Sequence, residues 1–365
     1  MRAVVFTSPD QPVEVLDVDI ASPGPGEVKI KIAGAGVCHS DLHLQRGDWP
    51  HPAPLVMGHE GSGVVVELGA GVTNLAEGDH VVISWVAPCG TCRHCLAGRE
   101  ARCELAASVV LPGGVLFDGT SRLSRNGQTV HHYLGTSSFA EYAIVPASGA
   151  IKIRQDAPLD VVALVGCAVA TGVGAVMNTA KVEAGSTVVV IGCGGVGLSV
   201  VQGARLAGAS RVIAVDLRRE KADVAATMGA TDVIDASSTN AIEAVRDLVP
   251  DGIDYAFDAI GHTATTEQAI AMLGLGGAAV IVGLPATGAR ASFEPLALAE
   301  AEQRILGCNY GSVRPAIDIP IMVDQYMAGD LMLDELVSDR RGLEDAARSL
   351  DELRTGAPLR TLLIP

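Results

Sequence analysis

Positive charge is scarce in this 365-residue sequence, in which 26 lysines and arginines stand against 42 aspartates and glutamates, giving a formal net charge of −16. The basic residues are not concentrated in any one segment. Nucleic acids and anionic membrane surfaces bind through basic patches, so we expect neither as a partner. Solubility is the plainer interpretation of this charge.

Uninterrupted hydrophobic spans are also lacking. Residues 161–180 and 184–204 are uncharged and long enough to suggest a membrane helix, but glycines and small polar residues break both, so buried strands and helices are the better interpretation. The N-terminal residues run directly into strand-like sequence without the apolar core of a signal peptide, and we therefore expect a cytoplasmic protein.

The length exceeds one ordinary hydrophobic core and predicts two domains with a cleft between them. Up to about residue 150 the chain reads as short strands separated by glycine and proline turns (13–18, 27–33, 63–68, 80–84). From Ser186 onward, apolar runs (187–191, 211–215, 232–234, 254–257, 278–282) alternate with helical patterns (196–206, 220–228). This alternation predicts a doubly wound parallel sheet, an α/β fold. We expect residues 169–310 to form that domain, and residues 311–365 to return to the β-rich domain of residues 1–168.

A glycine-rich loop follows the first strand of the predicted parallel sheet. The run Gly192-Cys193-Gly194-Gly195-Val196-Gly197 lies between strand 187–191 and a helical pattern, where a nucleotide-binding G-x-G-x-x-G belongs. Such glycines allow a tight turn and let a pyrophosphate approach the N–H groups of the helix N-terminus. The pattern alone is weak, because a glycine-rich chain can produce it by chance.

The next predicted strand ends at Asp216, at the distance expected for a carboxylate that binds the ribose of the adenosine half. A carboxylate there repels a 2′-phosphate and favours NAD over NADP. Arg218 and Arg219 follow immediately, and because of these two positive charges NADP is not excluded as the cofactor. The alternative for Asp216 is a solvated turn residue at a strand end.

Four of the eight cysteines are crowded into a short segment, at Cys89, Cys92, Cys95 and Cys103. Four thiolates on one lobe form the closed tetrahedral arrangement of structural zinc, which leaves no position for a substrate. A zinc ribbon that binds nucleic acid has a similar pattern, but the acidic chain argues against it. Cys38, His59 and Cys167 are far apart in the sequence. Their spacing alone does not group them into a site, because each could be a buried core residue.

Several motifs in order resemble the zinc-dependent alcohol dehydrogenases of the medium-chain dehydrogenase/reductase family, in their longer class I and class III form. They are GVCHSD at 36–41, GHEGSGVV at 58–65, GDHV at 78–81, the cysteine lobe, DGTSR at 118–122, HHYLGTSSF at 131–139, Gly166-Cys167, Thr171-Gly172, the nucleotide loop and RTLLI at 360–364. The resemblance covers nearly the whole chain. It implies a GroES-like catalytic domain and a Rossmann domain that binds NAD.

The resemblance also implies two zinc ions per chain. A catalytic zinc would be held by Cys38, His59 and Cys167 with one position open, and the cysteine lobe would hold a structural zinc. Asp41 would orient the ring of His59. Glu60 would lie near the metal as a possible alternate ligand, or else be a salt-bridged structural carboxylate.

The implied reaction is reversible hydride transfer between NAD and an alcohol or aldehyde. The alcohol must lose its proton before a hydride can leave, and the family moves that proton from a hydroxyl through the cofactor ribose to a histidine, here Ser40 and His43. Motif alignment places further residues around the cofactor: His39 and Arg360 near the pyrophosphate, Lys221 near the ribose, and Thr171 and Val196 against the nicotinamide. It places Trp49 and Trp85, the two tryptophans, in the substrate pocket.

Two other functions remain in view. Dehydrogenases of a thiol–formaldehyde adduct resemble the chain, but at the places of their acidic and arginine pair this sequence has Trp49, with Asp48 beside it, and Ala107. An enzyme that acts on the adduct of a different thiol remains possible, because Arg314 could bind the anionic tail of such a substrate. A non-enzymatic nucleotide sensor is the remote alternative. Finally, we expect a homodimer, formed by pairing of an edge strand near residues 304–310.

Overall fold

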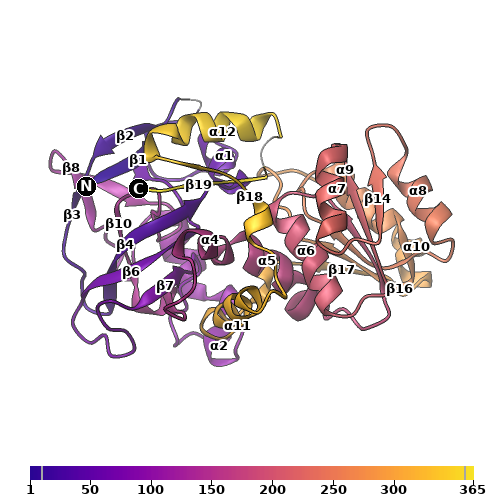
Figure 1. Ribbon diagram of the computed structural model, residues 1–365, viewed down its shortest axis with the longest axis horizontal. Coiled ribbons are helices and arrows are strands. Elements are labelled where there is room, and N and C mark those ends of the chain that lie inside the picture. The colour runs from indigo at the N-terminus through magenta and orange to yellow at the C-terminus, as the bar shows by residue number, and fades with distance from the viewer. Residues whose placement is uncertain (10, 357–358) are drawn as a thin grey trace. The chain divides into compact units, whose positions relative to one another are not determined.

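The computed structural model describes residues 1–9, 11–356 and 359–365 (Figure 1). The chain forms two compact units. Unit 1 comprises Met1–Cys167 and Arg314–Pro365, and unit 2 comprises Ala168–Val313. The β-rich fold predicted for the first and the parallel-sheet fold predicted for the second are both confirmed.

Unit 1 contains two sheets. In the larger, the strand order is β11-β7-β6-β4-β19-β18, and β10 pairs with β4. The bounds of these strands are β4 (Glu27–Gly36), β6 (Gly61–Leu68), β7 (His80–Ile83), β10 (Tyr142–Pro146), β11 (Ala150–Lys152), β18 (Val337–Arg341) and β19 (Arg360–Leu363). The other sheet has the order β2-β1-β5-β9-β8-β3, with β1 (Arg2–Phe6), β2 (Glu14–Asp17), β3 (Asp19–Ile20), β5 (Leu55–Val56), β8 (Leu123–Arg125) and β9 (Gln128–His132).

Strand β4 organises the larger sheet because it pairs with β6, β10 and β19. Its apolar side chains, among them Val28 and Ile30, enter a core that also contains residues of the C-terminal helix. The last strand, β19, lies beside β4 and so ties the end of the chain to its beginning (Figure 1). The helices of this unit are α1 (His39–Arg46), α2 (Arg93–Leu96), α3 (Leu111–Gly113), α4 (Leu159–Val162), α11 (Pro315–Met327) and α12 (Ala346–Arg354).

Unit 2 is built on a parallel sheet of order β14-β13-β12-β15-β16-β17. This is the strand order of a doubly wound dinucleotide-binding fold. The strands are β12 (Thr187–Ile191), β13 (Arg211–Asp216), β14 (Asp232–Asp235), β15 (Ile253–Asp258), β16 (Leu273–Ile281) and β17 (Arg304–Gly307). The helices are α5 (Ala168–Gly174), α6 (Gly195–Leu206), α7 (Arg219–Thr227), α8 (Ala241–Leu248), α9 (Thr263–Ala271) and α10 (Pro295–Glu300). The central strand β12 is apolar and buried over residues 188–191, because helices α6 and α9 pack against it.

Among the described residues, no single helix is long and apolar enough to cross a membrane. One bent pair of helical segments, Leu159–Gly166 and Ala168–Ala180, passes that test only when the two are joined, and core helices of soluble proteins do the same.

Candidate functional site

The ends of three strands in unit 1 bring scattered residues together. In the sheet register Gly36 of β4 pairs with Leu362 of β19, and Ala35 pairs with Gly61 of β6. Cys38 follows the end of β4, His59 and Glu60 precede the start of β6, and Arg360 opens β19. Strand pairing therefore gathers side chains that are up to 300 residues apart.

Three of these side chains and Cys167 form a compact group of metal-binding type. Cys38, His59, Glu60 and Cys167 each offer one ligand atom, and the four atoms lie within 4.8 Å of one another. Cys167 joins the group from the break between a short 3₁₀ segment, Ala163–Gly166, and α5. The Nε2 atom of His59 is buried and has no hydrogen-bond partner among the described residues. An orphaned imidazole nitrogen between two thiols is costly unless a cation takes its lone pair, so the group fits zinc.

Neighbouring side chains hold these donors in place. Asp41 Oδ1 lies 3.2 Å from His59 Nδ1, and Asp41 Oδ2 accepts a hydrogen bond from the Cys38 backbone N–H at 3.0 Å. This is the carboxylate–histidine arrangement that fixes the tautomer of a metal ligand. Tyr133, which the sequence analysis did not single out, packs edge-on against the His59 ring and donates its hydroxyl hydrogen to the Ser40 carbonyl at 2.8 Å. No short spacing pattern links Tyr133 to the site, since it approaches from the 131–139 segment.

For Glu60 the ion pair that the sequence left open is observed, and its role as an alternate metal ligand stays a prediction. It lies in the donor group and it also forms a fully buried ion pair with Arg360. Gly36 is required beside this pair, because a Cβ atom there would lie 2.8 Å from the Arg360 guanidinium and 2.9 Å from the Glu60 carboxyl carbon. Arg360 therefore has a partner within unit 1, and its contact with the cofactor pyrophosphate stays a prediction.

The protonation of the donor group is strongly coupled. A hydrogen bond from Cys167 lowers the pKa of Cys38 well below its ordinary value, and the same contact, together with burial, raises the pKa of Cys167. Burial lowers the pKa of His59, but Asp41 and Cys38 outweigh it and raise that pKa to about 10. Burial also raises the pKa of Glu60 to about 7, against the effect of Arg360. Zinc must displace protons from Cys167 and His59, so metal binding here releases protons.

Helix α1 places Ser40 and His43 on the chain just beyond Cys38. Ser40 Oγ lies 3.7 Å from Cys38 Sγ. His43 is half-buried, its Nδ1 lies 2.7 Å from Asp48 Oδ2, and its ring stacks on Trp49 with centroids 4.6 Å apart. Trp49 therefore contacts the histidine that is predicted to act in the proton relay.

The cysteine lobe forms the second metal-binding group. The sulfur atoms of Cys89, Cys92, Cys95 and Cys103 all lie within 4.8 Å of one another, and none of them is in a disulfide. Backbone N–H groups point at the sulfurs: Cys92 N–H donates to Cys89 Sγ, and Cys89 N–H donates to Cys103 Sγ, both at 3.3 Å. Despite some burial, hydrogen bonds from Thr91 and Cys92 lower the pKa of Cys89 to about 6. The lobe fits a closed site of four thiolates.

Three glycines of the nucleotide loop in unit 2 have different surroundings. Gly192 has φ of +96°, which favours glycine. A Cβ atom on Gly197 would lie 1.7 Å from the Gly192 carbonyl oxygen, so the helix approaches the strand closely. Around Gly194, by contrast, no atom of the described residues lies within 4 Å of a built Cβ. Gly194 is also the N-cap of α6 and supplies no side-chain cap, so its own side chain does not block a pyrophosphate from this helix N-terminus.

Asp216 is the last residue of β13 and borders this loop. Its Oδ2 accepts a hydrogen bond from Cys193 N–H at 2.7 Å, and its Oδ1 accepts one from Arg218 N–H at 2.9 Å. Burial lowers the pKa of Lys221, while the Asp216 charge opposes that shift. A carboxylate with a nearby lysine at this strand end fits the ribose of an adenosine group.

Comparisons with known proteins agree with this geometry. The family "Alcohol dehydrogenase GroES-like domain" matches residues 24–155, and "Zinc-binding dehydrogenase" matches residues 195–325. The chain is 40% identical to an S-(hydroxymethyl)glutathione dehydrogenase of Escherichia coli over 369 aligned residues, which cover 99% of both chains. The chain belongs to the zinc-dependent alcohol dehydrogenases.

Two solved structures extend this result. A zinc-binding alcohol dehydrogenase domain protein from Burkholderia ambifaria superimposes with a TM-score of 0.95 at 35% identity, covering 100% of this chain and 98% of that one. Benzyl alcohol dehydrogenase from Acinetobacter calcoaceticus superimposes with a TM-score of 0.94 at 32% identity, with the same coverage. The fold class, the enzyme class and the cofactors predicted from the sequence, zinc and NAD, are confirmed by family membership.

The remaining site residues predicted for this alcohol dehydrogenase are dispersed over both units. His39 is the exposed first residue of α1, and Trp85 is half-buried just after β7. Thr171 is buried in α5, and Val196 lies in the first turn of α6. Their roles toward cofactor and substrate stay predictions.

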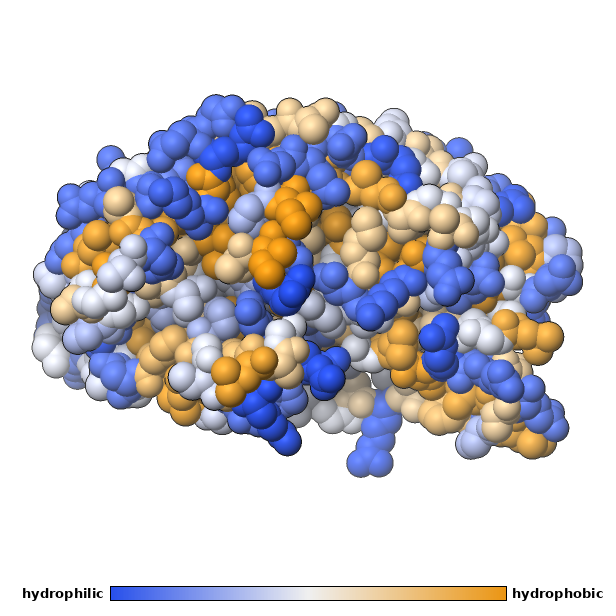
Figure 2. Space-filling view, turned by 90° about the horizontal axis from the view of Figure 1, so that it is seen from below, coloured by the Kyte–Doolittle hydropathy of each residue, from blue (hydrophilic) through white to orange (hydrophobic). Residues whose placement is uncertain are grey.

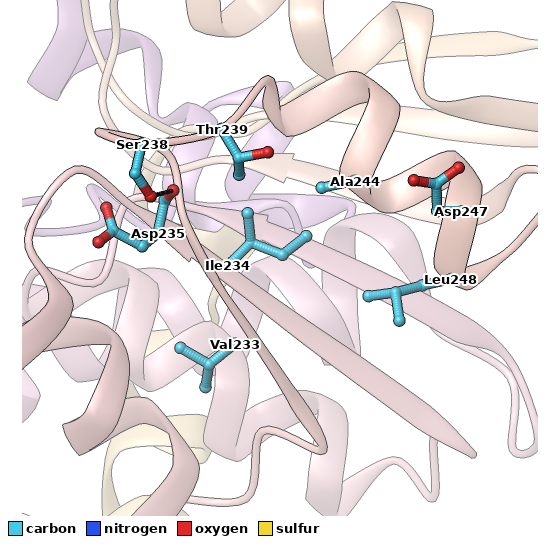
Figure 3. A pocket seen from close by; sticks show the side chains of 8 residues that line it. All are labelled: Val233, Ile234, Asp235, Ser238, Thr239, Ala244, Asp247 and Leu248. Carbon is cyan, nitrogen blue, oxygen red and sulfur yellow. Dashed lines mark hydrogen bonds between the residues drawn. The ribbon is translucent and has the colours of Figure 1, made fainter.

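A shallow hollow of about 370 Å³ lies on unit 2 beside β14, outside all of these motifs (Figure 3). Apolar side chains of β14 and α8 line it, with Asp235, Ser238 and Thr239 at one end and Asp247 at the other. Asp235 accepts hydrogen bonds from the N–H and hydroxyl of Ser237. Because local contacts engage its polar end, we assign the hollow no part in catalysis by the alcohol dehydrogenase.

Proposed function

We propose that Cys38, His59 and Cys167 hold the catalytic zinc, and that the enzyme reversibly oxidises primary alcohols, allylic or aromatic ones included, to aldehydes with NAD. The donor group in unit 1 carries this proposal, because its four ligand atoms lie within 4.8 Å of one another and the buried His59 Nε2 atom has no hydrogen-bond partner in the described part of the chain. The four lobe cysteines would hold the structural zinc. Gly192, Gly194, Gly195 and Gly197, with Asp216 and Lys221, would bind NAD.

Bound zinc would supply the positive charge that favours an ionised alcohol, and bound NAD would accept the hydride. The chain itself must remove the alcohol proton from a site that excludes water. Ser40 both donates and accepts a hydrogen bond, and it lies beside the ligand Cys38. We propose that Ser40 receives the proton and that His43, which is partly exposed, passes it to solvent.

Two relatives suggest different substrates for this site. The Acinetobacter relative is a benzyl alcohol dehydrogenase, and the Escherichia coli relative acts, by its name, on S-(hydroxymethyl)glutathione. An anionic tail needs a cationic partner, but the nearby carboxylate of Glu100 offsets the charge of Arg314, and the Arg314 backbone N–H donates a hydrogen bond to Asp318. Asp48 is bonded to His43. These contacts favour an uncharged alcohol.

A substrate panel tests the proposal. Initial rates with NAD and NADH are measured on aliphatic, allylic and benzylic alcohols, on their aldehydes, and on formaldehyde with glutathione. We expect kcat/KM to be highest for an allylic or benzylic alcohol. A rate on the glutathione adduct that exceeds all simple alcohols would reverse the assignment of substrate while keeping that of the zinc site.

We also propose that the enzyme is a cytoplasmic homodimer. Strand β17 ends the order of the unit 2 sheet, and apolar side chains around it are exposed, including Leu275 (85%), Leu296 (61%) and Ile305 (37%). Figure 2 shows hydrophobic patches over unit 2, on the side where Figure 1 labels α10 and β16. Burying such residues against a second copy would cap the sheet edge. The unpaired thiols of all eight cysteines suit a reducing compartment.

A further inference from the structure

The C-terminal turn of α1 fixes Asp48 beside His43. Gly47 adopts a left-handed conformation with φ of 74°, and its N–H donates to the Leu44 carbonyl at 3.0 Å. The N–H of Asp48 donates to the His43 carbonyl, also at 3.0 Å. These two bonds form a Schellman motif, in which the side chains at the positions of His43 and Asp48 are neighbours. The contact between those positions is usually apolar, but here it joins a carboxylate to an imidazole.

The His43 ring is held along one edge and across one face. Its Nδ1 atom lies 2.7 Å from Asp48 Oδ2. Trp49 stacks on the ring with an interplanar angle of 22° and centroids 4.6 Å apart. The side chains of His43 and Asp48 are 24% and 29% exposed, so water screens this contact only in part. The edge that carries Nε2 lies opposite the carboxylate.

An ionised carboxylate accepts hydrogen bonds but donates none. When such a carboxylate faces Nδ1 of a neutral imidazole, the shared hydrogen resides on Nδ1, and Nε2 keeps the lone pair that a proton acceptor needs. Carboxylates fix histidine tautomers in this way in catalytic triads and around metal ligands.

We infer that Asp48 is a positioning residue for proton transfer: it holds His43 in the Nδ1–H tautomer, so that Nε2 takes up the proton released through Ser40. This inference rests on the relay in the proposed function. Nε2 gains one proton, the ring becomes an imidazolium beside the Asp48 carboxylate, and the same nitrogen then releases the proton to water. The ring returns to its starting tautomer, and nothing else is consumed.

The tautomer can be measured without catalysis. Protein with ¹⁵N-labelled histidine is studied by NMR at about pH 8.5, above the ordinary pKa range of histidine, and the His43 signals are assigned by their loss in His43→Gln. We expect the Nδ1–H form in the wild type. Asp48→Ala should shift His43 toward the Nε2–H form, which a free imidazole prefers. A wild-type ring in the Nε2–H form would overturn the inference.

The second experiment is a double-mutant cycle, in which kcat is measured for Asp48→Ala, for His43→Gln and for the double variant. If Asp48 acts only through His43, Asp48→Ala should lower kcat about tenfold in the wild type and have no further effect in His43→Gln, while the Kd for NAD and the Tm change little. Asp48→Asn keeps an oxygen acceptor and should restore most of the lost rate. Asp156→Ala, which removes an ion-paired carboxylate elsewhere in unit 1, is the matched control and should leave kcat unchanged.

These measurements distinguish a failure of the Asp48 role from a failure of the Ser40–His43 relay. An equal loss from Asp48→Ala in both backgrounds, or no loss in either, would overturn the role of Asp48 and leave the relay intact. A wild-type kcat in His43→Gln would overturn the relay, and the role of Asp48 with it.

Discussion

His132 is a fully buried histidine whose environment keeps it neutral. Its Nε2 accepts a hydrogen bond from the Arg122 backbone N–H at 3.2 Å. Burial, reinforced by the positive charges of Arg122 and His131, lowers its pKa to about 3. In the unfolded chain the same ring titrates at its ordinary value of about 6.5. At pH values between these two pKa values, His132 is protonated in the unfolded state but not in the folded state. Lowering the pH through this range therefore favours unfolding.

We therefore predict that the folded enzyme loses about 1.4 kcal/mol of stability for each pH unit below 6.5 on account of His132 alone, until pH approaches 3. His132→Gln should lower stability at pH 7.5, because the ring packing is lost, but it should flatten this part of the acid dependence. Urea unfolding of both proteins at several pH values between 7.5 and 4.5 measures the two slopes. Parallel slopes would show that His132 is protonated in the folded protein.

Asp216 governs the choice of cofactor in our interpretation. Asp216→Ala removes a charged hydrogen-bond acceptor, and we expect it to raise the KM for NAD at least about tenfold and to narrow the preference for NAD over NADP. Because Asp216 also accepts the Cys193 N–H, the Tm of the variant must be measured alongside the kinetics. A wild-type enzyme that works better with NADP would refute this role.

At the scale of elements, the two metal-binding groups differ in what surrounds them. The cysteine lobe is carried by α2, a single turn of four residues, and by adjoining short segments with few buried side chains. Such a lobe has little core of its own and depends on metal for its conformation. The Cys38 group instead lies where β4, β6 and β19 meet, and those strands belong to the core of unit 1.

This difference predicts opposite effects of the same substitution. Cys95→Ser should lower the free energy of unfolding by several kcal/mol and lower the Tm with it. The protein that remains folded should keep most of its kcat. Cys38→Ser should abolish turnover with a nearly unchanged Tm. Cys308→Ser, a buried thiol in unit 2 outside both groups, serves as the control. Equal unfolding of the Cys38 and Cys95 variants would refute the division of roles.

For the whole molecule we predict two zinc ions per chain, since four thiolates form one group and two thiols with a histidine form the core of the other. Metal analysis of the purified enzyme measures the ratio. If Cys38→Ser loses one zinc ion per chain and keeps the other, each ion is assigned to its site. A ratio of one zinc ion or fewer per wild-type chain would contradict the prediction.

The homodimer is tested through β17. Ile305→Lys places a charge on the exposed apolar side of this strand, and we expect it to convert a dimer of about twice 37.4 kDa into monomer in analytical ultracentrifugation. Ile317→Lys, at a similarly exposed position of α11 in unit 1, is the matched control and should leave the dimer intact. A wild-type monomer or tetramer would refute the proposed assembly.

The sequence alone was sufficient for those features that depend on neighbours along the chain. The parallel strands follow from short apolar runs, as at Thr187–Ile191, and the nucleotide loop follows from glycines at fixed spacing after a strand. The cysteine lobe is equally local, since its four sulfurs fall within fifteen residues, Cys89 to Cys103. Local spacing fixes geometry over one turn or one loop, so such motifs can be identified before the fold is known.

Tertiary structure decided everything that joins distant segments. Cys38, His59 and Cys167 could be grouped from the sequence only by resemblance, because the register of β4 with β6 and β19 brings their surroundings together. The same register joins Glu60 to Arg360. The contact of Asp48 with His43 lies between these cases: it spans only five residues, yet it required the left-handed Gly47 to turn the chain back. A sequence pattern states which side chains are available, and the path of the backbone determines which of them meet.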